Sequence, residues 1–273
     1  MIPQILFEQK PFLQNIIDRL GANSIDFEEK WKEIKNSISK SSTTFHAAAV
    51  LFLLQFTAAY GEFTIQLIKR SETVSQPGDL SFPGGAMHPL TDRLLQSAMD
   101  CLLPLMSGGA GRYSRQRGSE VDHLVRLFLA TALRESWEEI GLNPCYVHFL
   151  GPLPTYSLTL FQRTIFPLVG FVRSSWRGRP NYEVEKILEV PVRIFFCCEN
   201  FRRFILDVNT QTVELPAIAV RNREDQEEIL WGATFNIIIR FLQITLDYTL
   251  PDLSSSPMVR RHLSEDYLTG RRP

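Results

Sequence analysis

The stretch ATALRESWEEIGL, residues 130–142, decides how the rest of the chain is organised. Spaced as an α-helix, it brings Glu135, Glu138 and Glu139 to positions i, i+3 and i+4, so that three carboxylates share one face. Another face carries apolar residues at i, i+4 and i+7, which we expect to bury against a core: Leu133, Trp137 and Ile140. Gly141 follows as a residue type that often ends helices. The stretch therefore predicts an amphipathic helix with one acidic face.

The acidic face has two interpretations. Like charges at helical spacing repel one another, and a hard cation would relieve that repulsion. Mg²⁺ is bound in proteins by a few carboxylates while it keeps waters and substrate phosphates as further ligands. The alternative is the solvated face of a surface helix, which needs no ligand. The spacing alone leaves both interpretations open.

A tight glycine turn precedes the helix in the segment LSFPGG, residues 80–85. Gly84 and Gly85 have no Cβ, so their backbone can approach a phosphate or a metal ion closely. A glycine pair by itself carries little information. Its position before an acidic helix is what makes it a candidate part of the same site.

The turn and the helix together resemble the signature of the Nudix hydrolases, G-x5-E-x7-R-E-U-x-E-E-x-G-U, where U is a bulky aliphatic residue. The second half matches from Arg134 onward, except that Ser136 stands at an aliphatic position. Counting from Gly85, the first acidic position falls on Thr91, and the nearest carboxylate, Asp92, comes one residue later. The spacing implies an insertion of about 34 residues inside the signature. We expect this insertion, at about 92–125, to be a loop or short helical excursion.

Further segments are similar to the coenzyme A pyrophosphatase branch of that family: ALRE at 132–135, LGPLPT at 150–155, PLVG at 167–170 and WGAT at 231–234. The resemblance runs from about residue 45 to 246. The branch also carries a coenzyme A motif of the form L-L-T-x-R-S-x3-R-x3-G. LIKRS, residues 67–71, and Gly78 fit this motif, whereas its second arginine is replaced by Val74 and a common histidine by Gln76. Loss of a cation there weakens a charge-assisted contact to phosphate.

The resemblance implies a divalent-metal pyrophosphohydrolase. Mg²⁺ or Mn²⁺ would be bound by Glu135, Glu138, Glu139 and the carbonyl of Gly85, while Arg134 would neutralise and orient the glutamates. Glu135, or a carboxylate from a later loop, could take the proton of the attacking water. The other role for Arg134 is an ordinary i,i+4 surface pair with Glu138.

Residues expected to contact the substrate are Gly84, Gly85, Arg70 and Ser71. Glu183 is a further candidate ligand, although most glutamates of this kind are simply exposed. A basic cluster, Arg112, Arg115 and Arg117, could close over phosphates, but a solvated loop is the preferred interpretation.

Three functions remain open. The first is hydrolysis of coenzyme A or its derivatives to 3′-phospho-AMP and 4′-phosphopantetheine. The second is Nudix hydrolysis of another nucleoside diphosphate derivative, such as ADP-ribose, NADH or a dinucleoside polyphosphate, which Val74 and the altered signature favour. The third is a Nudix-fold binding or regulatory module without catalysis. The three glutamates argue against the third function, and Thr91 and the insertion argue for it.

Composition limits the class of protein. The 273 residues are 44% hydrophobic and 22% charged, with a formal net charge of −1, values typical of a globular protein. The charge balance argues against a nucleic-acid partner, and the longest apolar run, residues 47–56, is too short to cross a bilayer. Four cysteines without metal-site spacing and a start without a signal-peptide pattern lead us to expect a soluble cytoplasmic protein. The expected partner is a small nucleoside diphosphate substrate, and a homodimer is left open.

The resemblance implies an α/β (α+β) fold of the Nudix type, a mixed β-sheet between helices, and the hydrophobic periodicity predicts both strands and helices. Residues 1–42 are expected to be an N-terminal helical extension, with helices at 11–20 and 27–38 and Asp26 as a cap of the second. Residues 43–250 are assigned to the main domain, in which residues 47–56 form a strand buried on both faces. Residues 251–273, polar and rich in arginine, are expected to be disordered.

Overall fold

The computed structural model describes residues 2–40, 46–58, 60–102, 106, 108–158, 162–172, 176–208, 211–221, 226–263 and 267. The expected domain boundary near residues 42 and 43 lies outside them. Within them, no helix has both the length and the apolar character needed to cross a membrane. Cys145, Cys197 and Cys198 are free thiols.

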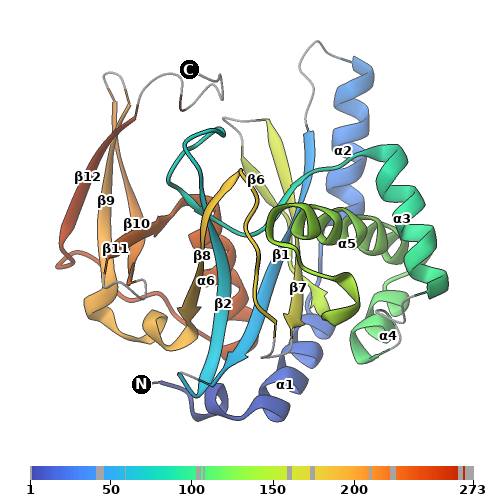
Figure 1. The fold of residues 1–273 in the computed structure, drawn as a ribbon, viewed down its shortest axis with the longest axis horizontal. Coiled ribbons are helices and arrows are strands. Elements are labelled where there is room, and N and C mark those ends of the chain that lie inside the picture. The colour runs from blue at the N-terminus through green and yellow to red at the C-terminus, as the bar shows by residue number, and fades with distance from the viewer. Residues whose placement is uncertain are drawn as a thin grey trace.

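The centre of the molecule is a mixed sheet whose strand order is β3-β2-β1-β7-β5, with β4 added to β1, β6 to β7 and β8 to β2 (Figure 1). β1 and β7 run parallel in the middle, and the other pairings are antiparallel. The strands are β1 (His46–Thr57), β2 (Glu62–Arg70), β3 (Leu80–Ser81), β4 (Gly84–Ala86), β5 (Val147–Pro152), β6 (Tyr156–Leu158), β7 (Arg163–Val172) and β8 (Val184–Pro191). The continuously apolar run at 47–56 thus forms the central strand, covered on both faces as predicted.

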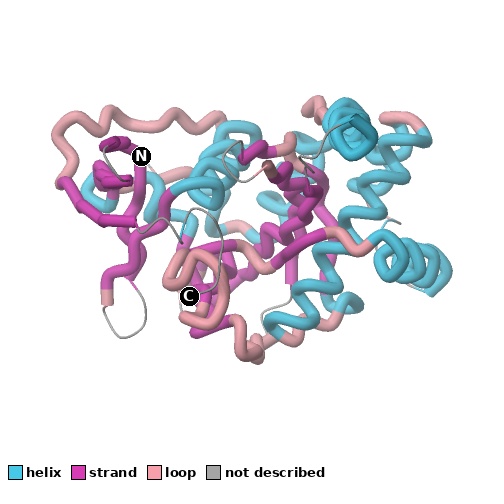
Figure 2. The backbone as a smooth tube through the Cα atoms, turned by 90° about the horizontal axis from the view of Figure 1, so that it is seen from above, coloured by secondary structure: helices cyan, strands magenta, loops and turns pink. Residues whose placement is uncertain are grey.

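Helices cover both faces of this sheet (Figures 1 and 2). α1 (Gln9–Ala22) and α6 (Gly232–Leu246) share one apolar core with the sheet, whereas α2 (Phe27–Lys40) and α5 (Ser119–Ile140) share the other. The predicted mixed sheet between helices is confirmed. The two N-terminal helices therefore lie on opposite faces of the sheet, α1 in one core and α2 in the other. Asp26 does not cap α2 with its side chain; its carboxylate accepts hydrogen bonds from the N–H and Oγ1 of Thr155 at 2.8 and 2.7 Å.

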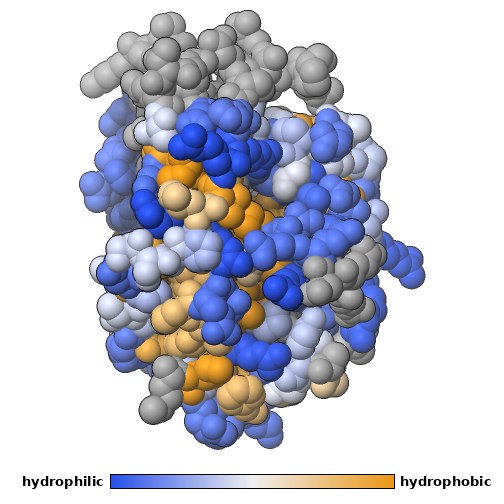
Figure 3. Space-filling view, turned by 90° about the vertical axis from the view of Figure 1, so that its left-hand side faces the viewer, coloured by the Kyte–Doolittle hydropathy of each residue, from blue (hydrophilic) through white to orange (hydrophobic). Residues whose placement is uncertain are grey.

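A second sheet, in the order β11-β10-β9-β12, lies beside the first. It consists of β9 (Phe201–Val208), β10 (Gln211–Arg221), β11 (Glu227–Trp231) and β12 (Met258–Leu263), and Figure 3 shows that the face carrying it mixes apolar and polar side chains. The prediction that residues 251–273 are disordered is wrong for β12, which pairs in parallel with β9. Val259 packs on the small apolar cluster of this sheet, and Tyr267 is buried in it. The polar composition of the segment concealed these contacts.

The insertion is helical, one of the two forms predicted for it, but it ends earlier than predicted. It folds into α3 (Pro89–Leu102) and α4 (Gly109–Gln116), and α5 already begins at Ser119, so residues 119–125 belong to the acidic helix. Arg117 donates hydrogen bonds to the carbonyls of Leu20, Gly21 and Asn23 at 2.7–2.9 Å. Arg112 and Arg115 therefore lie on a helix rather than in the predicted solvated loop, and Arg117 attaches the end of α4 to the end of α1.

The remaining elements are short 3₁₀ helices: η1 (Gln4–Phe7), η3 (Pro144–Tyr146), η4 (Val192–Phe196) and η5 (Cys198–Asn200).

Candidate active site

The acidic turns of α5 lie against the glycine turn at β4. Glu139 is only 5% exposed, and its Oε2 accepts a hydrogen bond from the N–H of Gly84 at 2.9 Å. Glu135 contacts the next residue so closely that a Cβ on Gly85 would lie 2.6 Å from its carboxyl group. Glu138 is exposed. The structure thus brings two of the three predicted carboxylates to the glycine turn and leaves the third at the surface.

Two other expectations for α5 can be compared with its burial. Gly141 adopts the left-handed conformation (φ 65°) and ends the helix as predicted. Leu133 and Ile140 are buried, but Trp137 is 55% exposed. The buried face includes Ser136 instead, whose Oγ donates to the Ala132 carbonyl at 2.6 Å. The small residue at the aliphatic position of the signature thus faces the core with its hydroxyl satisfied.

Arg134 connects the carboxylates to the turn. Its Nε donates to Asp92 at 2.7 Å, and its Nη1 lies 2.9 Å from Glu135 and 3.2 Å from Glu138. Its Nη2 donates to the carbonyl of Ala86 at 3.1 Å. Burial by itself lowers the pKa of Arg134, but the hydrogen bond to Asp92 and the charge of Glu135 outweigh it and raise the pKa. The expectation that Arg134 orients the glutamates fits these contacts better than a surface pair does.

Asp92 is the residue whose role the sequence left undefined. It is fully buried, and besides Arg134 it accepts hydrogen bonds from Thr131 Oγ1 at 2.8 Å and from the N–H of His88 at 2.7 Å. The N–H of His88 fixes Asp92 in the first turn of α3, directly opposite α5. Although Asp92 comes one residue later than the signature requires, its position in α3 lets it bind Arg134. The rest of the insertion does not disturb this contact. The only signal in the sequence was a carboxylate one position late.

The buried carboxylates carry unfavourable charge. Burial raises the pKa of Glu139 to about 8, opposed by the hydrogen bond from Gly84 and increased by the negative charge of Glu135. Burial likewise raises the pKa of Glu135, against the opposing effect of Arg134. Glu183 adds a further negative charge near Glu139, so this candidate ligand does lie in the same region. A cation bound here would relieve this cost.

The donor set fits a hard divalent cation. Carboxylate oxygens and backbone carbonyls are the ligands that Mg²⁺ and Mn²⁺ prefer, and a side chain on Gly85 would fill the space that Glu135 occupies. In the described part of the chain, however, no three carboxylate, imidazole or thiolate groups already lie at metal-site spacing. Glu135 and Glu138 turn toward Arg134 instead.

A cavity of about 400 Å³ extends from the glycine turn toward the second sheet. Gly84, Gly85 and Arg70 line it, as predicted for substrate contacts, together with Gln76. Ser71 does not line it, because its Oγ donates to the carbonyl of Tyr182 at 2.9 Å. Two features that sequence reasoning missed are also in its wall: Arg163 at the start of β7, and the aromatic residues Trp231 and Tyr267, which stack with ring centroids 6.4 Å apart.

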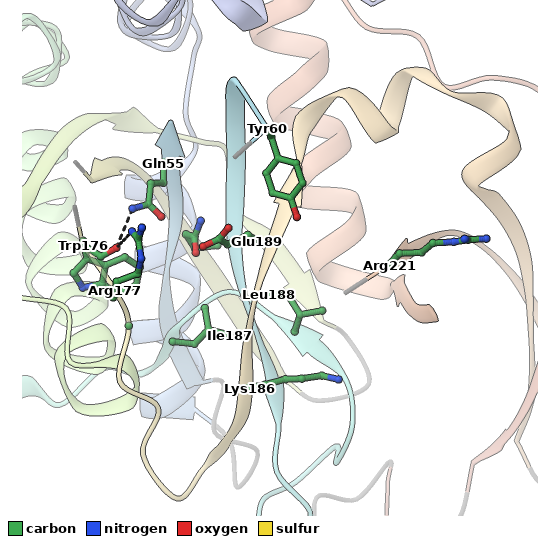
Figure 4. Close-up of a pocket in the computed structure, with 11 residues that line it drawn as sticks. Gln55, Tyr60, Trp176, Arg177, Lys186, Ile187, Leu188, Glu189 and Arg221 are labelled. Carbon is green, nitrogen blue, oxygen red and sulfur yellow. Dashed lines mark hydrogen bonds between the residues drawn. The ribbon is translucent and has the colours of Figure 1, made fainter. Parts of the chain in front are cut away.

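A second cavity of about 300 Å³ lies around β8 and is lined by Gln55, Gln66, Trp176 and Glu189, with Arg221 at its rim (Figure 4). Gln55 donates to the carbonyl of Trp176 at 3.1 Å. None of the predicted site residues lines this cavity. Glu139 and Glu135 of α5 contact Gly84 and Gly85, and these two glycines line the first cavity but not the second.

A mixed sheet between helices is the fold that the sequence resemblance implied, and in it an arginine holds an acidic helix against a glycine turn. No family model matches the chain. It is 29% identical over 197 residues to Nudix hydrolase 22, chloroplastic, of Arabidopsis thaliana (71% of this chain, 53% of the relative) and 26% identical over 145 residues to peroxisomal coenzyme A diphosphatase NUDT7 of Mus musculus (52% and 47%). A solved MutT/nudix family protein from Enterococcus faecalis aligns with 91% of this chain and 77% of its own at 12% identity, with a TM-score of 0.42.

The curated relatives that the chain resembles in sequence are Nudix hydrolases. The chain spans about half the length of the two curated relatives named above.

Proposed function

We propose that the protein is a divalent-cation-dependent pyrophosphohydrolase that cleaves the diphosphate of coenzyme A or a coenzyme A derivative, giving 3′-phospho-AMP and 4′-phosphopantetheine. The observation that carries the proposal is a pair of carboxylates, the buried Glu139 and the partly buried Glu135, held against the glycine turn at one end of a cavity. Isolated buried carboxylates are costly, and a site for a cation and a diphosphate is the use that offsets the cost.

Glu135, Glu138, Glu139 and the carbonyl of Gly85 are the groups that would hold Mg²⁺ or Mn²⁺. When bound, such an ion neutralises charge on the diphosphate and lowers the pKa of a bound water. Glu138 is exposed and needs only a rotamer change to leave Arg134, because it is attached by a single solvent-accessible pair.

The chain's own residues perform the remaining tasks. Arg134, fixed by Asp92, keeps the glutamates in place while the substrate enters. The glycine turn lets phosphate oxygens approach the backbone without a Cβ in the way. Glu135 is our candidate for accepting the proton of the attacking water, because burial raises its pKa toward the operating range of a general base. Arg70, which lowers the pKa of Glu139 through its charge, is near enough to pair with the diphosphate.

The substrate assignment has separate support. NUDT7, a relative in sequence, is named as a coenzyme A diphosphatase. In this chain, Arg70 of the coenzyme A motif lines the cavity, whose apolar walls suit the nucleoside or the pantetheine arm of a long substrate. Val74 removes one cation of that motif, so Arg70 carries more of the phosphate binding.

Glu138→Gln tests the proposal. Purified protein with Mg²⁺ is incubated with coenzyme A, ADP-ribose, NADH and diadenosine polyphosphates, and the products are separated by chromatography. We expect coenzyme A to be cleaved fastest and Glu138→Gln to lower its turnover by about 100-fold or more with the fold intact. Glu120→Gln, an exposed position in the first turn of the same helix, is the matched control. Full activity of Glu138→Gln would refute the ligand assignment, and cleavage of only another compound would refute the substrate.

A binding or regulatory module is the second candidate. It is favoured by one observation: Glu135 and Glu138 both pair with Nη1 of Arg134, and among the described residues they do not group with Glu139 at metal-site spacing. The same incubation separates the two candidates. Tight binding of one compound in calorimetry, without turnover of any of them, would support the module.

A further inference from the structure

Arg163, the first residue of β7, presents a cation to the candidate substrate cavity and has no side-chain partner among the residues that the structure describes. Its side chain is accessible and lines the cavity. Among the residues that the structure describes, none forms a hydrogen bond or an ion pair with its guanidinium. Partial burial and the positive charge of Arg70 lower the pKa of Arg163, and no carboxylate offsets them. Two neighbouring guanidinium groups thus repel each other beside an open cavity.

The carboxylate in the same wall does not neutralise Arg163. Asp79 is held by Arg261, whose Nη1 donates to it at 2.8 Å, and by the hydroxyl of Tyr267. The charge of Arg70 acts on Glu139 and on Arg163 alike, so Arg70 lies within electrostatic reach of both. Gly84, whose N–H binds Glu139, lines the same cavity as Arg70 and Arg163. The cavity therefore connects the acidic end of the site with both arginines.

We infer that Arg163 binds a phosphomonoester of the substrate that is separate from the diphosphate to be cleaved. The inference rests on the proposed function for the position of the diphosphate. A guanidinium pairs two phosphate oxygens at once, and a dianionic group relieves the repulsion between two arginines. A nucleoside diphosphate compound with an additional phosphate on its ribose carries this group in addition to the diphosphate. The stacked rings of Trp231 and Tyr267 in the same wall offer an apolar surface to its base.

Pairs of compounds that differ by one phosphomonoester test the inference. Coenzyme A is compared with dephospho-coenzyme A, and NADPH with NADH, by kcat/KM. We expect wild-type protein to prefer the phosphorylated member of at least one pair by about tenfold or more, as one charge-assisted contact provides. Arg163→Ala should remove most of that preference, because it lowers kcat/KM for the phosphorylated member far more than for the unphosphorylated one. Arg163→Lys, which keeps the charge but not the two-pronged geometry, should retain part of it.

Arg221→Ala is the matched control, since this arginine lines the other cavity and should not affect the preference. Equal losses on both members of each pair, or no loss on either, would overturn the inference.

A binding experiment separates this inference from the proposed function. Adenosine 3′,5′-bisphosphate and adenosine 5′-monophosphate contain no diphosphate to cleave, and their affinities are measured by titration calorimetry without a divalent cation. We expect the bisphosphate to bind more tightly to wild-type protein by about tenfold and to lose this advantage in Arg163→Ala. This result would support the inference even if none of the diphosphate compounds is hydrolysed. Equal affinities for the two nucleotides in wild-type protein would overturn it even if coenzyme A is cleaved.

Discussion

Two arginines, one in the C-terminal turns of α5 and one at the start of β7, differ in whether the protein provides partners for their charge. Arg134 on α5 contacts three carboxylates and one carbonyl of the protein, so its charge is fully used in the fold. Arg163 on β7 lines the cavity with no such partner among the described residues. The difference distinguishes a structural arginine from a ligand-binding one. Arg134 positions the carboxylates of the site, whereas we infer that Arg163 binds a phosphate group of the substrate. Each substitution below tests one part of this contrast.

The largest effect is expected at Asp92. Asp92→Ala leaves Arg134, of which 12% of the side chain is exposed, without its buried partner. Removing one member of a buried ion pair costs about 3–5 kcal/mol, so we expect the free energy of unfolding in urea to fall by that amount and activity to fall with it. Glu28→Ala, which breaks an exposed pair with Lys32, should cost under about 1 kcal/mol. If both variants were equally stable, Asp92 would not be the anchor of Arg134.

The acidic helix and the glycine turn could be predicted from the sequence, but the role of Asp92 could not. Helical spacing identified Glu135, Glu138 and Glu139, and the glycine pair identified the turn that they face, because these are local properties of the chain. Asp92 depends on where α3 starts relative to α5 across a long insertion, and spacing does not encode that. Its carboxylate was visible one residue late, without a role.

The other differences have similar causes. β12 has a polar sequence, and its stability comes from pairing with β9, a long-range contact that composition does not reveal. The sequence placed Arg117 in a basic loop. Its acceptors are backbone carbonyls at the end of α1, and no side chain in the sequence marks them as partners. Arg163 is the single charged residue of the segment 157–172, so no sequence pattern marks it, and only its position in the cavity wall suggests a function.

The second prediction concerns the pH dependence of Glu139. Its pKa is raised from an ordinary value of 4.5 to about 8, so between these values the folded protein holds a proton that the unfolded chain has released. The free energy of unfolding of metal-free protein should therefore fall as pH rises through this window, by about 2 kcal/mol or more. Urea unfolding from pH 5 to 9 measures it. Glu139→Gln should remove this contribution.

Repeating the urea unfolding with a divalent cation tests whether the same carboxylate binds metal. Mg²⁺ at pH 8 should stabilise wild-type protein, because it binds the ionised carboxylates of the folded state, and should stabilise Glu139→Gln much less. An identical pH dependence in wild-type protein and Glu139→Gln would show that the buried carboxylate carries no electrostatic cost.

A smaller effect is expected at Arg117, a second arginine used entirely by the fold. Arg117→Ala leaves the carbonyls of Leu20, Gly21 and Asn23 without this donor, which costs about 1–2 kcal/mol. Arg112→Ala, an exposed position on the same helix, should change stability by less than about 0.5 kcal/mol. Thermal unfolding compares them. Because the insertion braces α1 rather than the cavity, KM should be unchanged in both; a rise in KM for Arg117→Ala would return the cluster to the substrate site.

The smallest effect on stability is expected where we expect the clearest effect on specificity. Arg163→Ala removes a cation that pairs with no described group and that is repelled by Arg70, so the free energy of unfolding should change by less than about 0.5 kcal/mol, or rise slightly. Asp92→Ala serves as the contrast, measured in the same urea titration. A loss of about 2 kcal/mol or more in Arg163→Ala would mean that the protein already uses this arginine in its fold, as it uses Arg134. The distinction between an arginine that shapes the site and one that waits for the substrate would then fail.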